Sequence, residues 1–193
     1  MRGHLRFLRE FVRHPRAIGA VTPSSRRLAR EMIARMRPDD GDVFVEYGPG
    51  AGSFTHGMLA AVRAPRRFFA VELNPSFARA LRRRFPVLSL HEGCASRIRE
   101  FCEYEGVDGV DGVISGLPWA AFSGELQNRL LESTLGVMRP GARFVTFAYV
   151  HALHWPAARK FRRKLEALFP EVEVSDIVWR NLPPAICYTA VNR

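Results

Sequence analysis

The feature that most constrains the fold is an alternation of short apolar runs with stretches of helical periodicity. Five apolar runs have the length of buried strands and are separated by amphipathic segments. This alternation predicts an α/β fold with a doubly wound sheet of five parallel strands. The expected strands lie at 43–47, 67–73, 87–93, 112–118 and 142–150, and the expected helices at 53–62, 75–85, 125–138 and 155–169. Two further runs in succession, 171–179 and 186–192, predict an antiparallel hairpin at the sheet edge.

Local signals place some of the helix ends. Pro75 stands at a position that suits the first turn of a helix, and Ser123 is of the residue type that caps one. The segment Arg139-Pro140-Gly141 is expected to form the turn that ends the helix after Ser123.

The positive charge is concentrated at the N-terminus. Lys plus Arg number 29 against 19 Asp plus Glu, a formal net charge of +10. Residues 1–37 hold 10 arginines and 2 glutamates, so 10 − 2 = +8 of this charge lies there. We therefore divide the chain into a basic N-terminal segment, 1–37, and a nearly neutral domain, 38–193. A basic segment of this kind predicts an anionic partner, either nucleic acid or a lipid surface.

Several classes of protein are disfavoured by the composition. The three cysteines form no C-x-x-C pair, so we expect neither a disulfide framework nor a metal site. The longest uncharged stretch, 144–158, is shorter than the roughly 18 apolar residues that a membrane span requires. Arginines occupy the N-terminus where a secretory signal would be apolar, so the expected compartment is the cytoplasm.

A glycine-rich loop follows the first expected strand. Gly48, Gly50 and Gly52 let the backbone pass close to a ligand, and the next helix presents free N–H groups. Glu46 precedes this loop, and Glu72 ends the second strand twenty residues after Gly52. A carboxylate at that position can accept hydrogen bonds from both hydroxyls of a ribose. The pattern predicts a nucleoside ligand; the alternative is a tight turn and a surface glutamate.

These elements resemble the class I S-adenosylmethionine-dependent methyltransferases, which share the Rossmann-like sheet. The resemblance rests on E-x-G-x-G-x-G at 46–52, the acid Glu72, RPGARF before the fifth strand and the reversed final hairpin. It implies S-adenosylmethionine as cofactor and S-adenosylhomocysteine as product. Where the family often has G-D-A, this chain has Gly93-Cys94-Ala95, so only backbone groups of Cys94 and Ala95 are expected at the adenine edge. Ser115, within the fourth expected strand, is also expected at the cofactor.

The sequence SGLPW at 115–119 follows the fourth strand, where this fold receives the methyl acceptor. Enzymes that methylate the adenine amine have N-P-P-Y or N-L-P-Y there, and Gly116 replaces the asparagine in this chain. Leu117, Pro118 and an aromatic remain. A backbone carbonyl and the face of Trp119 would suit an alkyl ammonium better than a planar adenine edge. The alternative is that Trp119 belongs to the core.

The first residues, LRFLREFVRHP at 5–15, predict an amphipathic helix. At about 100° per residue, its apolar and basic residues separate into adjacent sectors, as in helices that lie in a membrane interface. The apolar sector holds Leu5, Leu8, Phe11 and Val12, and the basic sector holds Arg2, Arg6, Arg9 and Arg13. The alternative is a helix that packs its apolar side on the domain.

The chain as a whole resembles the bacterial soluble-type phospholipid N-methyltransferases, through AVTPSS at 20–25, SGLPW and WRNLPPA at 179–185. This resemblance implies methylation of phosphatidylethanolamine and its mono- and dimethyl forms towards phosphatidylcholine. It also implies a monomer that is peripheral at the inner face of the cytoplasmic membrane, with nucleic acid not a partner. Two alternatives remain: an rRNA or DNA adenine N6-methyltransferase, and a non-catalytic cofactor-binding or membrane-sensing protein.

The sequence offers few groups for the proton that the amine must lose. Tyr149, at the end of the fifth strand, is expected to orient the amine or relay its proton, with His151 and His154 as alternatives. Arg180 and Arg26 (or Arg27) are expected to hold the lipid phosphate, because a guanidinium fork matches phosphate oxygens.

Overall fold

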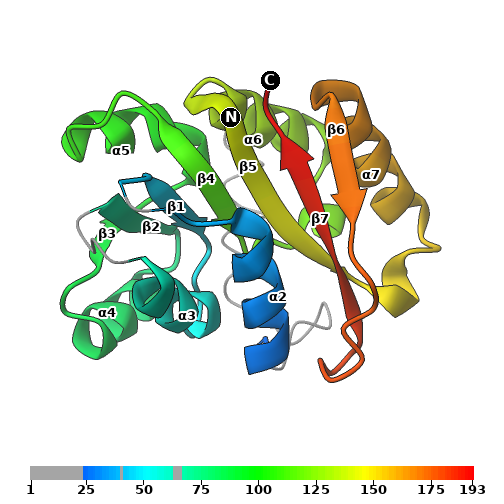
Figure 1. The fold of residues 1–193 in the computed structure, drawn as a ribbon, viewed down its shortest axis with the longest axis horizontal. Helices are drawn as coiled ribbons and strands as arrows, with labels where there is room; N and C mark the ends of the chain where they lie inside the picture. Colours follow the sequence, from blue (N-terminus) through cyan, green and yellow to red (C-terminus); the bar gives the residue numbers. More distant parts are fainter. Residues whose placement is uncertain (1–23, 40, 63–66) are drawn as a thin grey trace.

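The computed structural model describes residues 24–39, 41–62 and 67–193, which form one seven-stranded sheet with helices on both faces (Figure 1). The strand order is β3-β2-β1-β4-β5-β7-β6, with β1 to β5 mutually parallel and β7 antiparallel to both of its neighbours. The predicted α/β class, the five parallel strands and the antiparallel closing pair are confirmed. The amphipathic helix predicted at 5–15 and all the assigned membrane-binding residues, from Arg2 to Arg13, lie outside the described residues.

The elements have the following bounds. The strands are β1 Phe44–Tyr47, β2 Phe68–Glu72, β3 Ser89–Glu92, β4 Val110–Ser115, β5 Met138–Tyr149, β6 Glu171–Val174 and β7 Ala185–Val191. The α-helices are α2 Arg26–Met36, α3 Ser53–Ala61, α4 Pro75–Arg84, α5 Ile98–Tyr104, α6 Gly124–Leu135 and α7 Pro156–Leu168. Short 3₁₀ turns are η3 Ala95–Arg97, η4 Trp119–Ala121 and η5 Val150–Ala152.

The helix starts follow from local chemistry. Ser123 caps α6 by accepting a hydrogen bond from the Leu126 amide at 3.3 Å, as predicted. Asn74 caps α4 in the same way, and Pro75 occupies the first turn, where its missing N–H costs nothing. The short α5 was not predicted, because its seven residues are too few for a clear helical period.

The end of α6 differs from the prediction. The helix ends at Leu135, and Arg139-Pro140-Gly141 lies within β5 rather than in a helix-ending turn. Gly141 has a φ of +81°, and the β4–β5 register shifts between Val110 and Gly112. The positive φ of Gly141 therefore accommodates an irregularity at the start of β5.

The two faces of the sheet carry separate cores. One is covered by α5, α6 and α7, and the other by α2, α3 and α4. Figure 1 shows α2 lying across the strands, and its residues Leu28, Met32 and Met36 are at most 2% exposed. The division predicted at residue 37 thus does not separate α2 from the domain, because this helix completes the core.

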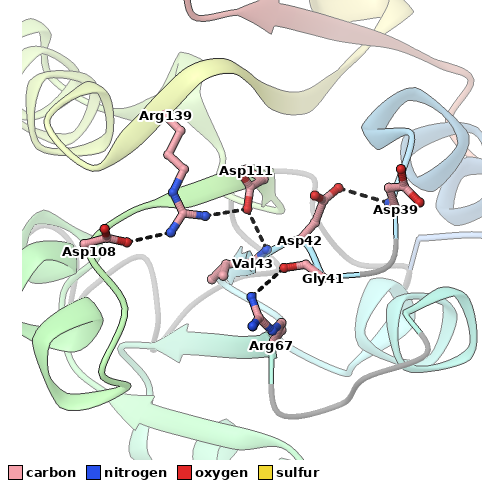
Figure 2. Close-up of polar contacts among 8 residues, drawn as sticks. All are labelled: Asp39, Gly41, Asp42, Val43, Arg67, Asp108, Asp111 and Arg139. Carbon is pink, nitrogen blue, oxygen red and sulfur yellow. Dashed lines mark hydrogen bonds and ion pairs between the residues drawn. The ribbon is translucent and has the colours of Figure 1, made fainter.

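The amino ends of the strands are joined by polar contacts (Figure 2). The Arg139 guanidinium donates to Asp108 at 2.6 Å and to Asp111 at 2.7 Å. Asp111 also accepts the Val43 amide at 2.8 Å. The beginnings of β1, β4 and β5 are thereby held together on the edge opposite the glycine loop.

Candidate active site

The glycine loop leaves β1 and leads into α3 at the carboxyl edge of the sheet. Gly48, Gly50 and Gly52 have φ values of +65°, +54° and +81°, a region that residues with a Cβ rarely adopt. The Gly48 amide donates to the Val71 carbonyl at 2.9 Å, which fixes the loop on β2. A Cβ at Gly116 would lie 2.8 Å from the Gly48 carbonyl, so the β4 loop approaches the glycine loop through a residue without a side chain.

Glu72 ends β2 under this loop. It is 5% exposed, and its two carboxylate oxygens accept the amides of Gly50 at 3.0 Å and Asn74 at 2.8 Å. Burial raises the pKa of Glu72, and these amide contacts work against the rise. The carboxylate oxygens have further lone pairs, so Glu72 can still accept hydrogen bonds from the hydroxyl groups of a ligand.

Glu46 lies in β1 and is completely buried. One of its oxygens accepts the Thr55 hydroxyl at 2.6 Å, and the other, Oε1, has no hydrogen-bond partner among the described residues. Burial, reinforced by the nearby Glu72, raises the pKa of Glu46 to about 8. A buried acceptor without a partner is costly, and a cationic ligand group would relieve that cost.

A pocket opens at this edge and collects most of the predicted cofactor and acceptor residues. The predicted residues that line it are Gly48, Gly50, Glu72, Cys94, Ala95, Gly116, Leu117 and Pro118. Further lining residues are Val71, Leu73, Phe77, Gly93, Phe122 and Leu130. The apolar ones among these were not predicted, although the position of Leu73 directly after the acid Glu72 is a signal that the sequence contains. One carboxylate between apolar walls suits a nucleoside with a flat base.

Gly52 does not line the pocket. It is the N-cap of α3, and a Cβ there would meet the ring of Phe85 at 2.5 Å. Its conformation shapes the loop, while the pocket surface comes from Gly48 and Gly50.

Trp119 is placed differently from the prediction that its face receives an ammonium. The side chain is 2% exposed and stacks on Phe161 with ring centroids 5.1 Å apart. Its Nε1–H donates to the Ser115 hydroxyl at 3.0 Å. Trp119 and Ser115 lie beneath the loop, and neither lines the pocket. The aromatic residues that contact Trp119, and the hydroxyl that accepts its hydrogen bond, are in the core. The structure corresponds to the alternative of a core tryptophan.

The carbonyls of this loop differ in what they bind. Ser115 accepts the Thr146 hydroxyl, and Leu117 and Pro118 accept the amides that form η4. Among the described residues, none donates a hydrogen bond to the Gly116 carbonyl. It is the acceptor of the loop that remains available for an N–H group.

Tyr149 and the two phosphate candidates lie away from the pocket wall. The Tyr149 ring is half-buried against Phe147 and His151, in the cluster covered by α2 and α3, and burial raises the pKa of its hydroxyl. This packing turns the ring away from the pocket, so the predicted contact with the amine is not seen. Arg180 shares a second groove with residues of α2, and Arg26 is exposed at the start of that helix.

No family model matches the sequence. The O-methyltransferase TomG of Streptomyces achromogenes, solved in complex with S-adenosylmethionine, has the same fold at a TM-score of 0.69 and 18% identity, over 95% of this chain and 87% of its own. The fold, the glycine loop and the acid after β2 define a class I S-adenosylmethionine-dependent methyltransferase.

The family is set by a full-length relative. An ornithine lipid N-methyltransferase of Singulisphaera acidiphila is 31% identical over 191 residues, covering 97% of this chain and 95% of its own. The chain belongs to the family of that enzyme. A small-subunit ribosomal RNA methyltransferase A of Burkholderia thailandensis is 39% identical over 66 residues, which is 33% of this chain and 24% of its own.

The residues present fit S-adenosylmethionine. Glu72 can accept hydrogen bonds from ribose hydroxyls, and a Cβ at Gly50 would meet nothing within 4 Å, so the loop leaves open space above it. Glu46, also predicted at the cofactor, is completely buried and does not line the pocket. No group of three or more metal-ligating side chains occurs in residues 24–39, 41–62 and 67–193. None of the helices described is long and apolar enough to cross a membrane.

Proposed function

We propose that this protein transfers methyl groups from S-adenosylmethionine to the primary amine of a membrane lipid. The observation that carries the proposal is the full-length similarity to an ornithine lipid N-methyltransferase. The pocket supports it, since the available Gly116 carbonyl lies on a loop with apolar neighbours and no charged side chain.

Each part of the site has a role in this reaction. The cofactor supplies an electrophilic methyl group on a sulfonium. Glu72 holds the nucleoside end. Glu46 is buried beneath the loop with a pKa of about 8, so it would have to lose its proton before it could offer a negative charge to the amino acid end. The Gly116 carbonyl accepts an N–H of the substrate amine and directs its lone pair, so the main contribution is positioning.

The amine must be neutral when it reacts. An alkyl amine has a pKa of about 10.4 in water, so neutrality at pH 7 costs about 4–5 kcal/mol. The walls formed by Leu117, Phe122 and Leu130 exclude water and lower that pKa, because burial disfavours the ammonium form. A proton can then leave to solvent before the amine is enclosed.

Two lipid headgroups present such an amine. The relative's substrate favours ornithine lipid, and the SGLPW and WRNLPPA segments favour phosphatidylethanolamine, with methylation continuing towards phosphatidylcholine. Both place the protein at a membrane surface, with Arg180 and Arg26 as the proposed contacts for the anionic part of the headgroup. For Tyr149 we propose an indirect part in shaping the substrate entrance from the end of β5.

The test is a direct transfer assay. Purified protein is incubated with methyl-labelled S-adenosylmethionine and vesicles that contain phosphatidylethanolamine, ornithine lipid or neither, and in parallel with ribosomal RNA. Label in N-methylated lipid of either kind supports the proposal, and the ratio of the two lipids identifies the preferred headgroup. Label in RNA adenine with none in lipid would replace the proposal by the adenine N6-methyltransferase alternative.

A further inference from the structure

The connection between β6 and β7, residues 175–184, lies at the edge of the sheet where the pocket opens. The Val150 amide, just after β5, donates to the Pro184 carbonyl at 2.9 Å, and Val178 bridges Ala185. Figure 1 shows this connection and the beginning of α2 at the same end of the molecule. The loop therefore lies at the same edge of the sheet as the site.

The loop is anchored from within. Asn181 is 3% exposed; its side-chain oxygen accepts the Ser25 amide at 2.9 Å, and its amide group donates to the Pro183 carbonyl at 2.7 Å. This buried residue ties the loop to the start of α2. The conformation of the loop is therefore fixed by hydrogen bonds of a buried side chain.

Around this anchor, large apolar side chains face solvent. Trp179 is 71% exposed and Leu182 is 77% exposed. Trp155, 54% exposed, reaches the same edge through ring contacts with His151, which stacks on Tyr149 at the end of β5. Two of the three tryptophans of the chain are therefore exposed here, while the third is in the core. Exposed tryptophan and leucine side chains close together are typical of a surface that binds a membrane or another macromolecule.

Positive charge surrounds these side chains. Trp179 shares a groove with Arg27, Arg30 and Arg180, and Arg26 is exposed next to it. Within the described part of the chain these arginines form no ion pair. The groove also contains Asp176 and Glu31, and Glu31 is paired with Arg35 at 2.8 Å. The positive charge exceeds the negative charge at this surface.

We propose that the β6–β7 loop, with Trp155 and the first turn of α2, is a docking surface for an anionic lipid bilayer. Trp179, Trp155 and Leu182 enter the headgroup region, where the amphipathic indole ring is stabilised. The four arginines bind anionic headgroups, a contribution that salt weakens. The orientation of the protein on the bilayer rests on the proposed function: docking by this surface turns the carboxyl edge of the sheet, and with it the pocket, towards the lipid amine. The exposed aliphatic side chain of Leu182 favours a bilayer over RNA as the partner, because RNA bases would stack on the tryptophans but not on a leucine.

The experiment uses the tryptophans of the full-length protein as reporters. The Trp155→Phe variant leaves Trp179 as the exposed indole, and the double variant Trp155→Phe/Trp179→Phe leaves only buried Trp119. Each is mixed with vesicles of phosphatidylglycerol and phosphatidylcholine that carry brominated acyl chains. We expect a blue shift and quenching from Trp179, and neither from the double variant.

Binding is measured in the same system by vesicle sedimentation. Trp179→Ala/Leu182→Ser is expected to lower partitioning into anionic vesicles about tenfold, with further loss in high salt for the wild type. The matched control is Val87→Ser/Tyr104→Ser, two apolar residues 68% and 82% exposed elsewhere, which should bind like the wild type. Cofactor affinity, measured calorimetrically, reports that each variant is folded.

The outcomes separate the two proposals. An unquenched Trp179 on bound protein overturns the docking surface, whatever lipid is methylated. Loss of RNA binding in the loop variant, with vesicle binding unchanged, overturns it in favour of RNA. If Trp179 is quenched and no aminolipid is labelled, the docking surface stands and the proposed reaction fails.

Discussion

The two edges of the sheet use opposite chemistry. At the amino edge, Arg139 is paired with Asp108 and Asp111, and Asp111 also holds a backbone amide of β1 (Figure 2). At the carboxyl edge, glycines adopt left-handed conformations, and one oxygen of the completely buried Glu46 has no hydrogen-bond partner in the part of the chain that the structure describes. One edge has its polar groups satisfied within the chain, and the other keeps groups available for a ligand. Variants at each edge should therefore affect different properties.

The largest effect is expected from Trp119, which lies beneath the carboxyl edge. Trp119→Ala removes a side chain stacked on Phe161 and should lower the free energy of unfolding by about 3–5 kcal/mol. Trp119→Phe keeps most of the packing and loses the hydrogen bond to Ser115, so it should cost about 1–2 kcal/mol. Urea unfolding followed by circular dichroism measures both.

The two variants also test where the tryptophan acts. If Trp119→Ala unfolds at the same urea concentration as the wild type and loses only methyl transfer, the ring faces the substrate and our assignment to the core is wrong. A cofactor affinity that changes little in Trp119→Phe would agree with the core position.

The second effect depends on pH and comes from Glu46. Its folded pKa, about 8, is above the usual value of 4.5, so the folded cofactor-free protein holds a proton that the unfolded chain releases between these values. Wild-type stability therefore falls as pH rises through this window, by at most about 1.4 kcal/mol per pH unit. Glu46→Gln keeps the neutral shape and removes this titration.

Thermal unfolding from pH 5 to 9 provides the measurement. The stability of Glu46→Gln relative to the wild type should increase with pH up to about pH 8 and then level off. The matched control is Glu92→Gln, which makes the same chemical change at an exposed position of the edge strand β3. A constant difference between Glu46→Gln and wild type across the range would mean that Glu46 is already ionised in the folded protein.

How much the sequence could predict also differs between the edges. The glycine loop and Glu72 lie together at the pocket, as the sequence indicates, because positive φ and strand ends leave a local signature in residue type and spacing. Their role in binding the cofactor stays a prediction. Trp119 was misplaced, since its orientation depends on Phe161, which is 42 residues further along the chain. The pairing of Arg139 with Asp108 and Asp111 was missed for the same reason, because it depends on strand register. Turns and strand ends can be predicted from a single sequence, whereas contacts between residues far apart in the chain cannot.

A third prediction concerns cofactor affinity and Glu72. Glu72→Ala removes a charged acceptor that also orders the Gly50 amide, so the dissociation constant for S-adenosylmethionine should rise about 30- to 100-fold, equivalent to about 2–3 kcal/mol. Isothermal titration calorimetry measures the change. Asp108→Ala, at the amino edge, serves as the control and should bind the cofactor like the wild type. Equal affinity of Glu72→Ala and wild type would remove Glu72 from the site.

The smallest effect is expected at the amino edge itself. Arg139→Met keeps the aliphatic part of the side chain and removes both ion pairs, of which Asp108 is almost fully exposed and contributes little. Asp111 is more protected and keeps the Val43 amide as a partner, so the expected loss is about 1 kcal/mol in the free energy of unfolding. Arg162→Met, which breaks an exposed pair with Glu166 in α7, should cost less, about 0.3–0.5 kcal/mol. Neither change should alter cofactor affinity, because the satisfied edge holds the strands together without contacting the ligand. A weaker affinity in Arg139→Met alone would show that strain at the amino edge reaches the glycine loop through β1, and the two edges would then have to be treated as one coupled unit.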